Sequence, residues 1–263
     1  MIIDKGFDNG RGFDWGKTSA DYGKYRDIYP QEFYEKIVEL GLCVKGQKVL
    51  DLGSGTGVLP RNMYKYGATF IGADIAENQI AEARRISEKF NMDIEYIVSP
   101  AEKVNFPDNT FDVVTACQCF MYFDKSIILP NIARMLKPGG ELAILFMAWL
   151  PDESQIAKQS EALVLKYNPS WTGGNMKRYN LGAPEWSQDL FDVEHKITFD
   201  INVSFTRETW NGRIKACRGI GASLDDAAVE AFEKEHNKLL EEIAPEQFNI
   251  LHYTTILVLK VKK

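Results

Sequence analysis

The run from Val49 to Gly57 constrains the fold more than any other stretch of the chain. It reads Val-Leu-Asp-Leu-Gly-Ser-Gly-Thr-Gly, so a short apolar run is followed by glycine at every second position. Such a run, bounded by glycines, is typical of a buried strand. The glycines indicate a sharp turn where backbone passes close to a ligand. A helix that begins there presents unpaired N–H groups, so the run predicts a strand, turn and helix that hold a nucleotide-like ligand.

The glycine spacing differs from that of two common kinds of nucleotide-binding turn. Gly53, Gly55 and Gly57 give G-x-G-x-G, whereas the dinucleotide fingerprint needs glycine at 58, where Val58 stands. The G-K-[ST] ending of a phosphate-binding P-loop is absent. A nicotinamide-dependent dehydrogenase is therefore the weaker interpretation, and a glycine turn without a ligand is the structural alternative.

Strands and helices alternate from residue 47 to 149. We expect strands at 47–52, 68–73, 94–98, 111–117 and 141–147, and helices at 58–66, 77–90 and 125–136. This alternation predicts an α/β fold with a mostly parallel sheet and helices on both faces. Asp51, Asp74, Ser99 and Cys117 fall at the carboxyl ends of strands, where such sheets bind ligands.

The flanking segments predict further elements. We expect helices at 30–40 and 153–166, a strand at 193–205, a helix after Thr206, and a last strand at 253–261. Ser223 is expected to begin another helix, with Asp226 as its capping-box partner, that runs to about Ile243. Prolines and glycines break up residues 150–190, which we interpret as an insertion.

The D-x-G-x-G-x-G turn, together with Asp74, resembles the first motifs of class I S-adenosylmethionine-dependent methyltransferases of the small-molecule type. The resemblance implies a Rossmann-like, seven-stranded, mostly parallel sheet whose last strand is antiparallel and lies between strands five and six, with a helical cap. We expect one domain over residues 1–263. Its core would be about 30–149 and 193–263, its N-terminal lid 1–29, and its cap insertions about 150–190 and 206–249.

The two strand-end acids are the central candidates for cofactor binding. The resemblance implies that Asp51 meets the cationic end of S-adenosylmethionine. An acid at the end of the second strand suits the two ribose hydroxyls, since a carboxylate accepts both hydrogen bonds. The structural alternative for Asp74 is the N-cap of the 77–90 helix.

Ala101 to Asp112 resembles the A-E-x-x-P-F-x-D-x-x-F-D stretch of the same family, which implies that Ala101 and Glu102 lie at the adenine. The sequence departs from the family at Pro100, where Asp is usual. The predicted cofactor-binding residues are Asp51, Gly53, Ser54, Gly55, Gly57, Asp74, Ile75, Ala101, Glu102, Cys117, Tyr22 and Arg26.

The run Cys117 to Asp124 resembles trans-aconitate methyltransferases, members of the methyltransferase type 11 group, at Gln118, Phe120, Phe123 and Asp124. Met121 and Tyr122 replace the His and Trp of that subgroup. Tyr122 and Gln118 are the weak catalytic candidates. Tyr22 and Arg26 also resemble the subgroup, in which such residues fold over the amino-acid end of the cofactor. A surface ion pair is the alternative for Arg26.

The acceptor side offers arginines that can clamp an acid and tryptophans that can line an apolar site. The candidates are Tyr122, Trp149, Trp171, Arg178, Trp210 and Arg213. Each has a structural alternative, either a solvated charge or a packed aromatic ring. The scattered histidines His195, His236 and His252 are weak candidates for a general base.

Composition limits the partners. The chain has 263 residues and a formal net charge of −6, which disfavours strong attraction to nucleic acid. No apolar run has the length of a membrane span, and the N-terminus lacks the apolar region of a signal peptide. The four cysteines form no metal-ligand or disulfide pattern, so we expect no metal and a reducing, cytoplasmic compartment.

Taken together, the motifs predict transfer of a methyl group from S-adenosylmethionine to a small molecule. The acceptor can be a carboxylate or another O, N, S or C nucleophile, and the oligomeric state stays open. The alternatives are a non-catalytic protein that binds S-adenosylmethionine and, less favoured, an NAD-dependent dehydrogenase.

Overall fold

The computed structural model describes residues 2–178, 185–187 and 189–263. The chain divides into two compact units. Unit 1 comprises Met1–Ile28, Ala148–Arg178 and Asp200–Tyr253, and unit 2 comprises Tyr29–Met147, Tyr179–Phe199 and Thr254–Lys263. The segments of unit 1 overlap those predicted as lid and cap insertions, and the single-domain organisation stays a prediction.

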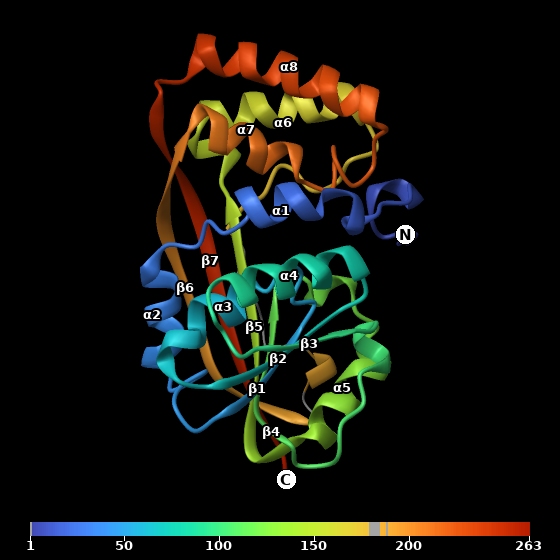
Figure 1. Cartoon of the computed structure of the whole chain (residues 1–263), viewed down its shortest axis with the longest axis vertical. Coiled ribbons are helices and arrows are strands. Elements are labelled where there is room, and N and C mark those ends of the chain that lie inside the picture. Colours follow the sequence, from blue (N-terminus) through green and yellow to red (C-terminus); the bar gives the residue numbers. More distant parts are fainter. Residues whose placement is uncertain (1, 179–184, 188) are drawn as a thin grey trace. The chain divides into compact units, whose positions relative to one another are not determined.

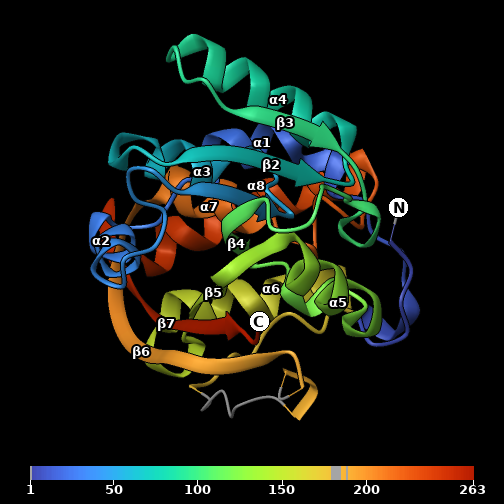
Figure 2. The same cartoon turned by 90° about the horizontal axis from the view of Figure 1, so that it is seen from below.

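A seven-stranded sheet has the order β3-β2-β1-β4-β5-β7-β6, which Figure 2 shows from one edge to the other. The strands are β1 Lys48–Leu52, β2 Thr69–Asp74, β3 Glu95–Val98, β4 Phe111–Cys117, β5 Leu136–Trp149, β6 Phe191–Thr206 and β7 Gln247–Val261. The pairs β1/β2, β1/β4, β2/β3 and β4/β5 are parallel. The mostly parallel, Rossmann-like sheet that the sequence predicts is confirmed.

Strand β7 runs against its neighbours. The Leu150 N–H donates to the carbonyl of Leu251, whereas Lys263 Nζ donates to the carbonyl of Leu136 at the other end of β5. Residue numbers therefore rise in opposite directions along β5 and β7. The position of β7 between β5 and β6 also agrees with the prediction.

Strand β5 is longer than the predicted 141–147. It begins at Leu136, which pairs with Phe111, and the register then shifts so that Glu141 pairs with Val113. The intervening residues bulge out of the ladder, with Gly139 in the left-handed region at φ +77°. The Pro and Gly residues that end the preceding helix thus interrupt the strand without ending it.

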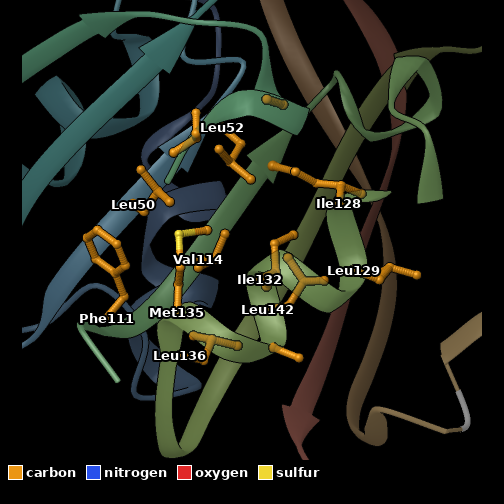
Figure 3. Close-up of a cluster of buried hydrophobic side chains, with 14 of the residues drawn as sticks. Leu50, Leu52, Phe111, Val114, Ile128, Leu129, Ile132, Met135, Leu136 and Leu142 are labelled. Carbon is orange, nitrogen blue, oxygen red and sulfur yellow. The ribbon is translucent and has the colours of Figure 1, made fainter. Parts of the chain in front are cut away.

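Helices of unit 2 cover both faces of its part of the sheet because apolar side chains alternate along the strands. They are α2 Gln31–Glu39, α3 Val58–Met63, α4 Glu77–Lys89 and α5 Lys125–Met135. Leu50 and Val114 pack with Ile132 of α5 in one buried cluster, which Figure 3 shows. Val49 and Val113 belong to the cluster on the opposite face, which also includes residues of α2 and α3.

Unit 1 contributes α1 Ser19–Tyr25, α6 Gln155–Tyr167, α7 Arg207–Lys215 and α8 Asp226–Ile243, labelled in Figure 1. A capping box between Thr206 and Thr209 begins α7. The N-cap of α8 is Asp225, whose side chain accepts from the Ala228 N–H, so the predicted start at Ser223 is wrong. The Ser223 hydroxyl instead donates to the Arg218 carbonyl, which removes it from the cap.

Short 3₁₀ helices are Asp8–Gly10, Trp15–Thr18, Tyr64–Tyr66, Ala101–Lys103, Phe120–Tyr122, Pro151–Glu153 and Glu185–Ser187. Within the described ranges, no helix combines the length and the apolar character needed to cross a membrane.

Candidate cofactor site

The glycine turn between β1 and α3 requires glycine for two separate reasons. Gly53 and Gly57 have φ of +65° and +74°, in the left-handed region that side chains with a Cβ rarely adopt. A Cβ on Gly53 would lie 2.7 Å from Cys119 Sγ, and one on Gly57 would lie 2.2 Å from Tyr96 Oη. The turn therefore lies tightly against β3 and the segment after β4, and only glycine fits at both positions.

Asp51 lies in β1, directly before the turn, and is 2% exposed. The hydroxyl of Thr115 in β4 donates to Asp51 Oδ1 over 2.6 Å. Burial raises the pKa of the Asp51 carboxyl to about 7, the hydrogen bond from Thr115 opposes the rise, and the charge of Asp74 adds to it. A buried carboxyl of this kind gains from a cationic ligand, because an opposite charge favours its ionised form.

Asp74 is the last residue of β2, and its carboxylate contacts both the glycine turn and the segment that leads into α4. Its Oδ2 accepts from the Gly55 N–H over 2.9 Å, and its Oδ1 accepts from the Ala76 N–H over 2.8 Å. Burial raises the pKa of Asp74, while these two donors oppose the rise. The N-cap of α4 is Ala76, so the alternative that Asp74 caps this helix is wrong. The carboxylate instead holds the centre of the glycine turn.

The segment after β4 also reaches the glycine turn. The Cys119 thiol donates to the Leu52 carbonyl over 3.0 Å, and the Cys117 thiol donates to the Tyr29 hydroxyl over 3.6 Å. Gln118 has a φ of +66°, and its backbone N–H and side-chain amide donate to the Leu145 and Met147 carbonyls of β5. Strained backbone of this kind is often found at functional sites, where surrounding contacts hold it in place.

The predicted adenine side lies beyond β3. Ala101 is buried, and the Glu102 carboxylate accepts from the Asp124 N–H over 2.9 Å. This contact joins the A-E motif to the segment after β4. Ile75 is 53% exposed at the end of β2. Tyr122 is half-buried in unit 2.

The glycine turn carries two buried hydroxyl groups that suit a polar ligand. Ser54 Oγ and Thr56 Oγ1 are both buried, and neither has a hydrogen-bond partner among the described residues. Burying a hydroxyl without a partner costs free energy. Gly55 between them has no neighbour closer than 3.8 Å to an added Cβ. Buried hydroxyls, a backbone that allows close approach and two acids fit the polar groups of S-adenosylmethionine.

The remaining predicted residues lie in unit 1, and their roles toward the cofactor stay predictions. Arg26 donates to the Tyr22 hydroxyl over 3.0 Å, and its guanidinium lies 4.6 Å from the centre of that ring. Arg178 forms ion pairs with Glu153 and Asp200, and its role toward the acceptor stays a prediction.

The three candidate tryptophans of unit 1 are buried. Trp210 Nε1 donates to Ser160 Oγ, and Trp149 Nε1 donates to Glu161 Oε1. Trp171 is 6% exposed. Arg213 is 5% exposed, with its guanidinium 4.8 Å from the centre of the Trp149 ring. Arg213 thus lies over the Trp149 ring, and the roles of these residues toward the acceptor stay predictions.

Sequence reasoning missed Thr115 and Tyr96. Thr115 is a polar residue within the otherwise apolar stretch 113–117 of β4. Aligning β4 with β1 places it opposite Asp51, so this alignment is a signal that could have found it. Tyr96 packs against Gly57 and forms a hydrogen bond with Ser87 over 3.1 Å. Its contact with the turn depends on how β3 lies beside β2, which local sequence does not encode.

Comparisons with known proteins agree with this geometry. The model of the methyltransferase domain family matches residues 50–144. The ubiquinone biosynthesis O-methyltransferase of Bradyrhizobium diazoefficiens is 32% identical over 123 residues, which cover 46% of this chain and 48% of that protein. The protein of the same name from Pseudomonas entomophila is 29% identical over 216 residues, which cover 74% of this chain and 90% of that protein. The chain thus spans about half the length of the Bradyrhizobium relative.

A solved structure shares the fold. The crystal structure of the YcgJ protein from Bacillus subtilis superposes with a TM-score of 0.53 at 19% identity, covering 89% of this chain and 99% of that one. Residues 50–144 match the methyltransferase domain, and together with the fold this match supports a class I S-adenosylmethionine-dependent methyltransferase. The resemblance to trans-aconitate methyltransferases stays a prediction.

Proposed function

We propose that the protein transfers the methyl group of S-adenosylmethionine to a small-molecule acceptor. The observation that carries this proposal is the meeting of Asp51, the glycine turn and Asp74 within the matched methyltransferase domain. The O-methyltransferase relatives support an oxygen acceptor, although C, N and S nucleophiles are also compatible with the class. The four free cysteines support a reducing compartment.

Each part of the site has a role in binding. The ionised Asp51 pairs with the cationic amino-acid end of the cofactor, and Asp74 accepts from the ribose hydroxyls. The backbone of the glycine turn approaches the ligand, and the Ser54 hydroxyl lies beside it. The bound cofactor supplies a methyl group that its sulfonium already activates. The protein then has to bind, orient and desolvate the two reactants.

Calorimetric titration with S-adenosylmethionine, S-adenosylhomocysteine and NADH tests the proposal. We expect the two sulfur ligands to bind in the micromolar range, about −8 kcal/mol, and NADH to show no binding. Asp74→Ala should weaken binding roughly tenfold or more, since hydrogen bonds to a charged group contribute about 1.5–3 kcal/mol. Asp93→Ala, which removes an exposed acid beyond α4, is the matched control.

The outcomes separate the alternatives. Equal affinity in wild type and Asp74→Ala, with both folded by circular dichroism, would contradict the site assignment. Binding of NADH alone would favour a dehydrogenase. Formation of S-adenosylhomocysteine with acids, phenols or amines as acceptors would exclude a protein that only binds the cofactor.

A further inference from the structure

His252 is a buried hydrogen-bond acceptor in unit 1. The residue lies in β7 and is fully buried, with its ring stacked on Phe205 at a centroid distance of 6.1 Å. Its Nδ1 lies 2.9 Å from the carbonyl oxygen of Ile250. A carbonyl oxygen only accepts, so Nδ1 carries the proton and Nε2 keeps its lone pair. Among the residues that the structure describes, Nε2 has no hydrogen-bond partner.

A buried cation lies on the same indole ring as this imidazole. The Trp149 ring centroid is 6.5 Å from the His252 ring and 4.8 Å from the Arg213 guanidinium. Burial lowers the pKa of His252 to about 3, and the positive charges of Arg213 and Arg26 lower it further. The imidazole is therefore neutral at physiological pH, and its free nitrogen can accept a hydrogen bond.

Helix packing brings the second cation to this cluster. Tyr25 of α1 lies directly over Gly212 of α7, where an added Cβ would be 2.4 Å from the Tyr25 ring. Lys24 reinforces the contact with an ion pair to Glu208 over 3.0 Å. Arg26 follows Tyr25 and Arg213 follows Gly212 in the chain. The contact between Tyr25 and Gly212 therefore brings the two arginines to neighbouring positions of the packed helices, and the positive charges of both lower the pKa of His252.

The groups of this cluster define a ligand chemistry. The free nitrogen of His252 accepts a hydrogen bond, whereas a guanidinium only donates hydrogen bonds. A hydroxyl group is both. A carboxylate would face the lone pair of Nε2 without a proton to share, and an ammonium would be repelled by two guanidinium groups. The neighbouring rings of Trp149 and Phe205 suit an aromatic body.

We infer that His252, Arg213 and Trp149, with Arg26 as a second cation, bind the hydroxyl group of a phenol-like small molecule. The hydroxyl donates to Nε2 of His252, and its oxygen accepts from the guanidinium of Arg213. This binding is a property of unit 1 and is independent of the proposed function. Of the three histidines, the structure thereby selects His252 as the residue that contacts the ligand.

The probes are 4-nitrophenol and 4-nitroanisole, used at a pH below the pKa of the phenol, so that they differ in whether the oxygen carries a hydrogen. We expect calorimetry to show binding of 4-nitrophenol at least tenfold tighter than that of 4-nitroanisole. Arg213→Gln and His252→Phe should each weaken 4-nitrophenol binding at least tenfold, and the phenyl ring keeps the stacking on Phe205. Arg11→Gln, which changes an exposed arginine of the same unit, should leave the affinity unchanged.

A spectroscopic readout follows the imidazole itself. In protein labelled with ¹⁵N-histidine, 4-nitrophenol should shift the Nε2 resonance of His252, assigned by its loss in His252→Phe, and 4-nitroanisole should leave it in place. Absent binding of 4-nitrophenol, equal affinity for the two probes, or an unmoved Nε2 resonance would each overturn the inference. S-adenosylhomocysteine binding measured on the same samples keeps this result separate from a failure of the proposed function.

Discussion

Replacing Gly57 by alanine tests the interpretation of the glycine turn most directly. The substitution forces a residue with a Cβ to adopt a φ of +74°, which costs about 1–2 kcal/mol. The new Cβ would also lie 2.2 Å from Tyr96 Oη and 2.8 Å from Cζ of the same ring. Overpacking in a core typically costs about 1–3 kcal/mol. We therefore expect Gly57→Ala to lower the free energy of unfolding by about 2–5 kcal/mol.

Gly139→Ala is the matched control, because it separates the two contributions. Gly139 has a similar φ of +77°, but a Cβ there would meet nothing within 4 Å. Its substitution should cost only the backbone contribution, about 1–2 kcal/mol. The difference between the two variants, about 1–3 kcal/mol, then measures the contact with Tyr96.

The assay is urea denaturation followed by far-ultraviolet circular dichroism, with Tyr96→Phe completing a double-mutant cycle. Tyr96→Phe alone should cost about 1 kcal/mol, since it removes the hydrogen bond with Ser87. In the Gly57→Ala background it should instead recover stability, because it removes the closest clashing atom. If Gly57→Ala and Gly139→Ala were equally destabilised, or if the cycle showed no coupling, the steric argument would be refuted.

Two further predictions concern buried charges. Since burial raises the pKa of Asp51 from 3.8 to about 7, the unfolded chain ionises this group first, and its contribution to stability falls as pH rises from 3.8 to about 7. Asp51→Asn should remove that fall. The free energy of unfolding of the variant, measured by urea denaturation, should therefore increase relative to that of wild type across this pH range. A difference in free energy of unfolding that does not change with pH would contradict the raised pKa of Asp51. Asp8→Ala should destabilise unit 1 by about 3–5 kcal/mol in thermal denaturation, because Arg218 is 8% exposed and loses its carboxylate partner. Lys24→Ala, which breaks an exposed pair with Glu208, should change the thermal stability far less and serves as its control.

The elements of unit 2 were predictable because each repeats a local pattern. β4 lies at Phe111–Cys117 as expected, and α4 at Glu77–Lys89 matches the predicted 77–90 within one residue. Apolar alternation and strand-end acids are encoded within a few residues of the elements they define. The same information placed Asp51 and Asp74 at one edge of the sheet, where the register of β1 and β2 brings them together.

The errors arise where local signals compete. Ser223 and Asp225 both suit a helix N-cap, and the fold uses Asp225 because the Ser223 hydroxyl donates to Arg218. Asp74 carries the sequence signature of a cap, yet its carboxylate accepts from Gly55, a residue 19 positions earlier. Side-chain partners of this kind are chosen by the tertiary structure, which a local pattern does not contain.

The same contrast between local and tertiary information separates the predicted cofactor residues from the phenol-binding cluster. The matched domain, residues 50–144, lies within the Tyr29–Met147 segment of unit 2 and holds all the predicted cofactor residues except Tyr22 and Arg26. A short motif suffices there because one strand and the turn after it carry many of the predicted cofactor residues. In unit 1, Trp149 meets Arg213 from a distant part of the chain, and His252 comes from a third segment. Chemistry assembled from such remote segments becomes visible only once the chain has folded, so the cofactor could be predicted from sequence, whereas the phenol-binding cluster required the structure.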